Sequence, residues 1–222
     1  DQEALNVYLE EISDKTIYFD SEIERLHYLV DNHFYFNVFK KYSEEDLIEI
    51  IEFAKSINFE FASYMSASKF YKDYALKTND KSKYLEDYNQ HVAIVALYLA
   101  DGNKEQAKQF ILAMIEQRYQ PATPTFLNAG RARRGELVSC FLLEVDDSLN
   151  SINFIDSTAK QLSKIGGGVA INLSKLRARG EAIKGIKGVA KGVLPVAKAL
   201  EGGFSYADQL GQRPGAGAVY LN

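Results

Sequence analysis

The sequence predicts a helical N-terminal domain followed by an α/β domain, because its two halves differ in composition. Residues 1–117 contain 20 aromatic residues, no proline and one of the 15 glycines, whereas residues 118–222 contain 7 aromatic residues and all four prolines. The first half holds 12 basic and 22 acidic residues, and the second half holds 14 and 8. Such a shift near Arg118 is typical of a domain boundary and predicts domains at residues 1–117 and 118–222.

The first half carries N-cap signals followed by helical periodicity. Ser43 with Asp46 forms a capping-box pattern, and Asn103 is a favoured N-cap residue. The apolar residues that follow at helical spacing are Leu47, Ile50, Ile51 and Ala54 in the first case and Ala107, Phe110, Ile111 and Met114 in the second. The other helical patterns cover residues 21–32, 61–77 and 83–100. We therefore expect a packed helical bundle, which suits dense aromatic residues and scarce glycine.

The second half alternates between strand and helix patterns. In chain order, strand, helix, strand, helix and strand are expected at residues 138–145, 148–164, 169–173, 192–210 and 218–221. Ser148 is a suitable N-cap for the first of these helices, and Pro195 suits the opening turn of the second. Strands that alternate with helices predict a parallel sheet.

The bulk properties exclude several classes of protein. A net charge of −4 argues against a general nucleic-acid coat, and no run approaches the roughly 18 apolar residues of a membrane span. A single cysteine rules out an internal disulfide framework and suits a reducing compartment such as the cytoplasm. The chain begins at Asp1 without a signal-peptide pattern and stops at Asn222 within an apolar run, so we expect both ends to be cuts in a longer protein.

The candidate reactive side chains are three histidines and one cysteine. His27, His33 and His91 lie in the helical half without a nearby carboxylate or cysteine pattern, so we expect structural or surface roles for them. Cys140 lies in a predicted strand, where a free cysteine is commonly buried and inert. Ser139 beside it leaves a second interpretation open, because both side chains can line one site if the strand ends or twists there.

Three consecutive glycines separate a predicted helix from a predicted strand. Gly166, Gly167 and Gly168 follow Lys164 in the order helix, glycines, strand, which is the reverse of a Walker or dinucleotide motif. They form either a tight turn or a close approach of backbone N–H groups to a ligand oxygen.

Several further signals concern anionic ligands. Two prolines stiffen residues 121–125, so Thr123 is expected to present its hydroxyl from a rigid loop, either to a phosphate or within a linker. Asp147, next to Asp146, either accepts a hydrogen bond from a ribose hydroxyl or helps to cap the following helix. Two basic clusters are expected to form solvated loops: Arg131, Arg133 and Arg134, then Lys175, Arg177, Arg179, Lys184, Lys187 and Lys191. Glycines within the second cluster leave another interpretation open for it, a flexible loop that closes on an anionic ligand such as a nucleoside triphosphate.

Taken alone, these residues predict a phosphate- or nucleotide-binding α/β segment. A helical interaction module with a basic, non-catalytic α/β appendage is the alternative.

Four motifs in order carry a resemblance to a known family. They are PATPTFLNAG, RGELVSCFLLEVDDS, QLSKIGGGVAINLSKLRARGEAIKG and SYADQLGQRPGAGAVYL. Together they resemble the large subunit of aerobic class I ribonucleotide reductases, with the nearest likeness to class Ib. The resemblance implies a ten-stranded α/β barrel behind a helical domain, of which residues 118–222 would be the first portion.

The resemblance also implies a reaction and a substrate site. The family reduces ribonucleoside diphosphates by radical chemistry, and Cys140 corresponds to the first cysteine of its redox pair. Thr123, Ser139, Cys140 and the backbone of Gly168 correspond to substrate-binding positions. The radical cysteine and the second redox cysteine would lie beyond Asn222, so this chain alone is expected to be inactive.

An allosteric effector site is implied as well. The implied effector-contacting residues are Asp147 and Arg177, with Ser148, Lys164 and Ile183 as weaker candidates. The loop that would link effector and substrate contains Asp208, Gln209 and Arg213. Its glycines would allow the alternate shapes that coupling between two sites requires.

The remaining expectations concern ligands and partners. The resemblance implies nucleoside triphosphate effectors, a homodimer that packs through the helices at 148–164 and 192–210, and a thioredoxin- or glutaredoxin-like reductant. A metal-containing small subunit would supply the radical, so we expect no metal or other cofactor on this chain. No nucleic-acid or membrane partner is expected. A stand-alone nucleotide-binding regulator remains an alternative.

Overall fold

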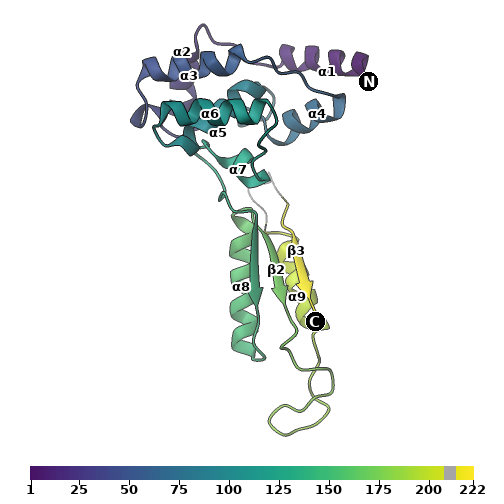
Figure 1. Cartoon of the computed structure of the whole chain (residues 1–222). Coiled ribbons are helices and arrows are strands. Elements are labelled where there is room, and N and C mark those ends of the chain that lie inside the picture. The colour runs from purple at the N-terminus through teal and green to yellow at the C-terminus, as the bar shows by residue number, and fades with distance from the viewer. Residues whose placement is uncertain (208–213) are drawn as a thin grey trace. The chain divides into compact units, whose positions relative to one another are not determined.

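The computed structural model describes residues 1–207 and 214–222, and these residues form two compact units, Asp1–Arg134 and Gly135–Asn222 (Figure 1). The boundary between the units follows Arg134 in the sequence, 16 residues after the composition shift near Arg118. The intervening segment belongs to the helical unit because its Arg131 side chain is buried there. No helix in the described ranges is long and apolar enough to cross a membrane.

The first unit is helical, as predicted. Its α-helices are α1 (Gln2–Asp14), α2 (Glu22–Asp31), α3 (Glu44–Ser56), α4 (Tyr64–Asp73), α5 (Tyr88–Ala100), α6 (Lys104–Ile115) and α7 (Thr123–Asn128), with a 3₁₀ turn η1 at Val38–Lys40. The Ser43 hydroxyl accepts a hydrogen bond from the Asp46 N–H, and the Asn103 side chain accepts one from the Gln106 N–H. Both predicted N-caps are therefore confirmed.

Helix α5 lies at the centre of this unit. Its middle residues are apolar on every side and buried, as expected of a helix that neighbours surround. Helices α3 and α6 pack against it and bury the predicted apolar stripes, including Leu47 and Ile111. The chain leaves α5 through Asp101 in a left-handed conformation and then turns at Gly102.

The rigid loop expected at residues 121–125 is a helix start instead. Thr123 is the first residue of α7, and Pro124 occupies the first turn. Proline is compatible with this position because its fixed φ is helical and its missing N–H would have no partner there.

The second unit is a three-stranded parallel sheet with two helices. Its elements are β1 (Cys140–Glu144), α8 (Leu149–Lys164), β2 (Gly168–Asn172), α9 (Leu194–Phe204) and β3 (Gly217–Tyr220). The strands lie in the order β1-β2-β3, and both pairs are parallel, as predicted. The expected cap at Ser148 is present, and Pro195 lies in the first turn of α9.

Both helices cover the same face of this sheet (Figure 1). Val169 and Ile171 of β2 are buried against α8 and α9, together with Ile155 and Leu200. Because successive side chains of a strand point to opposite faces, Cys140 and its neighbours at even-numbered positions lie on the other face. Within the chain, Leu142 on that face is 78% exposed.

This arrangement predicts very different effects for two apolar truncations. We expect Ile171→Ala to destabilise the chain by about 2–5 kcal/mol, because it leaves a cavity in the core of the second unit. We expect Leu142→Ala, the matched control, to change stability by less than about 0.5 kcal/mol. Urea unfolding followed by circular dichroism measures both. Equal losses would contradict the assignment of the two faces.

Candidate functional site

Cys140 opens strand β1 and is exposed, so the buried, inert cysteine that its strand context favoured is not what the structure has. Its cross-strand partner is Gly168, whose N–H donates to the Ser139 carbonyl oxygen at 2.9 Å. The Cys140 thiol donates to the Ser139 hydroxyl at 3.6 Å. Side chains alternate between the two faces only within a strand, and β1 begins at Cys140. Ser139 lies before the strand, so its side chain can approach that of Cys140. Three of the four predicted substrate residues are thus brought together.

Two of the three glycines have a steric reason. Gly166 has a φ of +98°, which lets the chain turn out of α8. A side chain at Gly167 would collide with the Phe141 ring, and a Cβ at Gly168 would come within 4.0 Å of the Cys140 sulfur. Gly166 therefore allows the turn after α8 and Gly167 makes room for the Phe141 ring, whereas a Cβ at Gly168 would make only an ordinary contact with the thiol.

Thr123, the fourth predicted substrate residue, belongs to the helical unit. It begins helix α7, and its hydroxyl oxygen accepts a long hydrogen bond of 3.5 Å from the Tyr74 hydroxyl. The Tyr74 ring also packs against Phe126 of the same helix, with ring centroids 5.3 Å apart.

Asp147 and Arg177, the main predicted effector residues, form an ion pair. The Arg177 Nε donates to the Asp147 carboxylate at 2.7 Å, and the Arg177 Nη1 donates to the Ala182 carbonyl oxygen at 2.8 Å. Both side chains are about one-third exposed. The pair therefore ties the loop after β2 to the end of β1 while part of each charged group stays accessible.

The weaker effector candidates are spread along the second unit. Ser148 adjoins Asp147 and caps α8, while Ile183 follows the carbonyl that Arg177 contacts. Lys164 is the last residue of α8. A helix of 16 residues is about 24 Å long, so Lys164 lies far from Ser148 at the other end and does not join the other candidates within this chain. The predicted linking residues Asp208, Gln209 and Arg213 lie outside the described residues.

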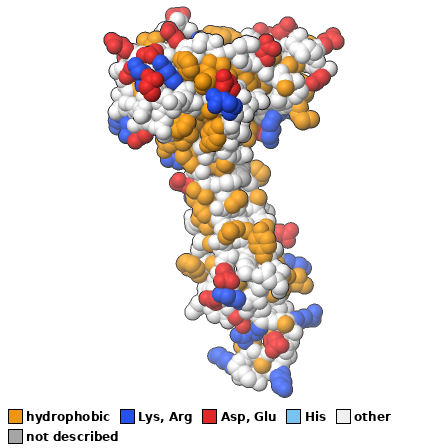
Figure 2. Space-filling view, in the orientation of Figure 1, with side chains coloured by type: hydrophobic (Ala, Val, Ile, Leu, Met, Phe, Trp, Pro, Cys, Tyr) orange, Lys and Arg blue, Asp and Glu red, His pale blue; other side chains and the backbone are white. Residues whose placement is uncertain are grey.

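The basic loop between β2 and α9 is only partly neutralised. Lys175 pairs with Glu144 and Asp146, and these hydrogen bonds raise its pKa. Lys184, Lys187 and Lys191 are exposed, and basic side chains are visible at this end of the second unit (Figure 2). The expectation of a solvated cationic loop holds for these lysines.

A buried cluster of charged groups in the helical unit escaped the sequence analysis. The Glu86 carboxylate is fully buried and accepts hydrogen bonds from Tyr35, His91, Arg131 and the Leu76 N–H. Arg131, grouped above with solvated basic residues, is only 8% exposed. Burial acts to raise the pKa of Glu86, but Arg131, His91 and the hydrogen bonds outweigh burial and hold that pKa well below its usual value.

The cluster extends to helix α2. The Arg25 guanidinium donates to the Tyr35 hydroxyl at 2.9 Å and to the Leu85 carbonyl oxygen at 3.0 Å. Burial is the main cause that raises the pKa of Tyr35. The pairing of Arg131 with Glu86 gives no sequence signal, because the two residues lie 45 positions apart. The pairing of His91 with Glu86 spans only five residues, so the acidic residue near His91 was the available signal.

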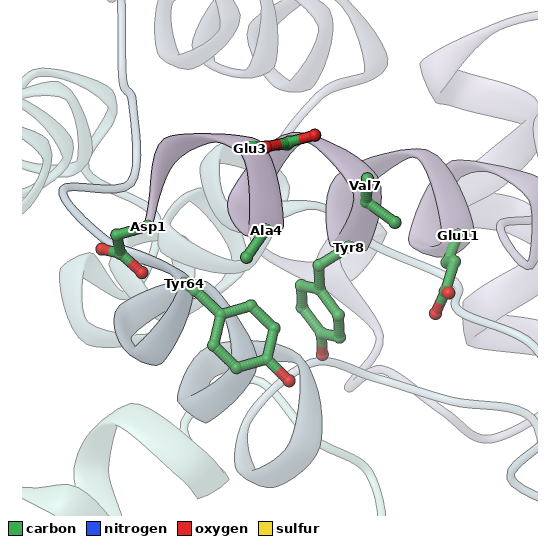
Figure 3. Close-up of a pocket in the computed structure, with 7 residues that line it drawn as sticks. All are labelled: Asp1, Glu3, Ala4, Val7, Tyr8, Glu11 and Tyr64. Carbon is green, nitrogen blue, oxygen red and sulfur yellow. The ribbon is translucent and has the colours of Figure 1, made fainter.

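A surface pocket also lies between α1 and α4 (Figure 3). Its aromatic wall is formed by Tyr8 and Tyr64, whose rings pack edge to face at 5.2 Å. None of the predicted site residues that the structure describes lines it. Within residues 1–207 and 214–222, no group of three or more histidine, cysteine or acidic side chains is placed to hold a metal ion.

Three family descriptions match consecutive parts of the chain. Residues 1–59 match the ribonucleotide reductase N-terminal family, residues 60–134 the ribonucleotide reductase all-alpha domain, and residues 138–222 the ribonucleotide reductase barrel domain. The chain belongs to the ribonucleotide reductase large-subunit family. The resemblance carried by the four motifs is confirmed, as is the order of a helical domain followed by the start of the α/β barrel.

Individual reductase relatives agree with this membership. The ribonucleoside-diphosphate reductase subunit alpha of Bacillus subtilis is 56% identical over the whole chain, which covers 32% of that relative. Its counterpart in Mycoplasma pneumoniae is 48% identical over the whole chain and is covered to 31%. The ribonucleoside-diphosphate reductase large subunit of vaccinia virus is 29% identical over 83% of the chain, and the matched region makes up 23% of that relative. The chain thus spans about a third or less of these reductase subunits.

The lowered pKa of Glu86 predicts a loss of stability in acid. A carboxyl group with a lowered folded-state pKa stabilises the fold above its unfolded pKa, and this stability is lost as the pH falls below about 4.5. Glu86→Gln should cost about 3–5 kcal/mol at neutral pH, because it leaves buried cations unpaired. It should also flatten the acid limb of the curve of stability against pH.

Urea unfolding of the 222-residue chain at a series of pH values measures this effect. Glu49→Gln is the control, because Glu49 pairs with Lys104 and Lys108 at the surface, where solvent screens the charges. An acid limb that persists unchanged in Glu86→Gln would contradict the assignment.

Proposed function

We propose that this chain is the substrate- and effector-binding part of an enzyme that reduces ribonucleoside diphosphates to deoxyribonucleoside diphosphates. The observation that carries the proposal is the exposed Cys140 thiol beside Gly168, at the start of a strand within the barrel-domain match. The printed names of the relatives, ribonucleoside-diphosphate reductases, support the substrate class.

Cys140 would act as one half of a redox pair. Replacing a ribose hydroxyl by hydrogen releases water and consumes two electrons, which two thiols can supply by forming a disulfide. The sequence contains no second cysteine, so the other thiol must come from elsewhere in a complete subunit. A radical cysteine would start the reaction, a metal-containing small subunit would supply the radical, and a thioredoxin- or glutaredoxin-like protein would restore the thiols. This chain alone would be inactive.

The predicted polar groups of each unit would bind the substrate. The Ser139 and Thr123 hydroxyls can donate to ribose or phosphate oxygens, and the absence of a side chain at Gly168 allows a ligand to approach the strand. This set needs no metal or other cofactor on the chain. It fits a reducing compartment such as the cytoplasm, where the thiol persists.

Asp147 and Arg177 would bind a nucleoside triphosphate effector. A carboxylate suits a ribose hydroxyl, and a guanidinium suits phosphate oxygens. Ser148 and Ile183 lie close to this pair along the chain, and Lys164 could take part only from the far end of α8. Asp208, Gln209 and Arg213 would link the effector to the substrate.

The outer surfaces of α8 and α9 would support a homodimer. They expose Leu149, Phe154 and Leu194, each about 70% accessible in the single chain. Exposed large apolar side chains on helices are typical of contact with another subunit. Neither nucleic acid nor a membrane is part of this proposal.

The role of Cys140 predicts the behaviour of Cys140→Ser in a complete subunit. Turnover should fall below detection, because a hydroxyl cannot form the disulfide that balances the reduction. Effector affinity should stay unchanged, because Asp147 and Arg177 remain intact. Steady-state assays with the partner subunit and equilibrium binding measure the two quantities. Normal turnover would refute the reductase assignment.

The role of Arg177 predicts weaker effector binding in Arg177→Ala. Loss of a charge-assisted hydrogen bond should lower the affinity for a deoxynucleoside triphosphate by about tenfold or more. Lys187→Ala removes an exposed positive charge from the same loop and is the control for non-specific charge effects. Equal losses in both variants would show that only the general charge of the loop matters.

A further inference from the structure

His91 in helix α5 is fully buried between two hydrogen-bond acceptors. Its Nδ1 lies 2.7 Å from a Glu86 carboxylate oxygen, and its Nε2 lies 2.7 Å from the Phe126 carbonyl oxygen. A carboxylate and a carbonyl oxygen only accept hydrogen bonds, so both ring nitrogens must donate. The geometry therefore requires a doubly protonated imidazolium ring.

The neighbouring Arg131 leaves this assignment intact. Its Nη2 lies 2.6 Å from Glu86 and 2.8 Å from the Tyr74 carbonyl oxygen, so both of its hydrogens already have acceptors. The 3.3 Å approach of this nitrogen to His91 Nδ1 needs no further hydrogen bond. Glu86 is thus the shared anion that faces two cations and fixes the orientation of both.

The far side of the imidazolium holds helix α7. This helix has six residues, too few to be stable without tertiary contacts. The His91 Nε2–H donates a hydrogen bond to the Phe126 carbonyl oxygen. The Phe126 and His91 rings also pack edge to face, with their centroids 4.5 Å apart. Phe126 lies one helical turn after Thr123, so fixing its carbonyl fixes the start of the helix as well.

Tyr74 makes a second connection to the same threonine. Its carbonyl oxygen accepts from Arg131, its ring packs on Phe126, and its hydroxyl approaches the Thr123 hydroxyl at 3.5 Å. Two routes therefore lead from the buried Glu86 carboxylate to Thr123, one through His91 and α7 and the other through Arg131 and Tyr74.

We propose that His91 and Tyr74 are positioning residues that hold the Thr123 hydroxyl in place for the substrate. This inference rests on the proposed function, in which Thr123 binds the ribonucleoside diphosphate. The charge on His91 serves this task because a hydrogen bond from a cation to the Phe126 carbonyl is stronger than one from a neutral ring.

Steady-state kinetics of the complete subunit with its radical-supplying partner test the proposal. The variants are Thr123→Ala, His91→Gln, Tyr74→Phe and the double variants that combine each positioning change with Thr123→Ala. His91→Gln and Tyr74→Phe should raise the KM for a ribonucleoside diphosphate by about three- to tenfold while kcat changes by less than about twofold. Neither change should raise KM further once Thr123 is already alanine.

Two controls separate positioning from general damage. His27→Gln alters a half-exposed histidine that bonds to Glu44 at the surface, and it should leave KM unchanged. Effector affinity should be the same in all variants. A merely structural role would reduce the amount of folded enzyme, and hence the apparent kcat, without moving KM. If His91→Gln fails to fold, Tyr74→Phe decides the question, because its hydroxyl lies at the surface.

The outcomes distinguish the positioning role of His91 and Tyr74 from the proposed function itself. If Thr123→Ala itself leaves KM unchanged, the substrate role of Thr123 in the proposed function is wrong. If Thr123→Ala raises KM but Tyr74→Phe does not, the positioning inference is wrong and the proposed function stands. The same holds if the Tyr74→Phe, Thr123→Ala double variant raises KM by the product of the two single effects.

Discussion

The buried carboxylate of Glu86 is the constraint on which the helical unit depends. A charge without water must be matched by hydrogen bonds and opposite charge, and Glu86 obtains them from a tyrosine, a histidine, an arginine and a backbone N–H. These partners come from separate segments of the unit. Satisfying one side chain therefore fixes the relative placement of α5, α7 and the chain between α4 and α5.

The second unit depends on a different constraint, the two-residue alternation of a parallel sheet. Because α8 and α9 both cover one face, Val169 and Ile171 complete the core and Cys140 is left on the other face. Gly167 makes room for the Phe141 ring, and Gly168 is the cross-strand neighbour of Cys140. The core and the candidate site thus lie on opposite faces of the same short strands.

Local sequence signals predicted much of this organisation. Caps at Ser43, Asn103 and Ser148 and the alternation of strands and helices appear in the structure where they were expected. The start of α7 at Thr123 was missed, because two prolines are compatible both with an extended loop and with the opening of a helix. The burial of Arg131 was missed because its neighbours Arg133 and Arg134 made it look like part of a solvated cluster.

The sequence by itself determined the division into a helical and an α/β part, the positions of most elements and the four motifs that identify the family. These features depend on residues close together in the chain, where spacing and residue type are sufficient. Only the tertiary structure decided that Cys140 is exposed beside Gly168 and that Glu86 joins His91 and Arg131 in the interior. Glu86 and Arg131 are 45 residues apart, and no local pattern records which distant charge will neutralise a buried one.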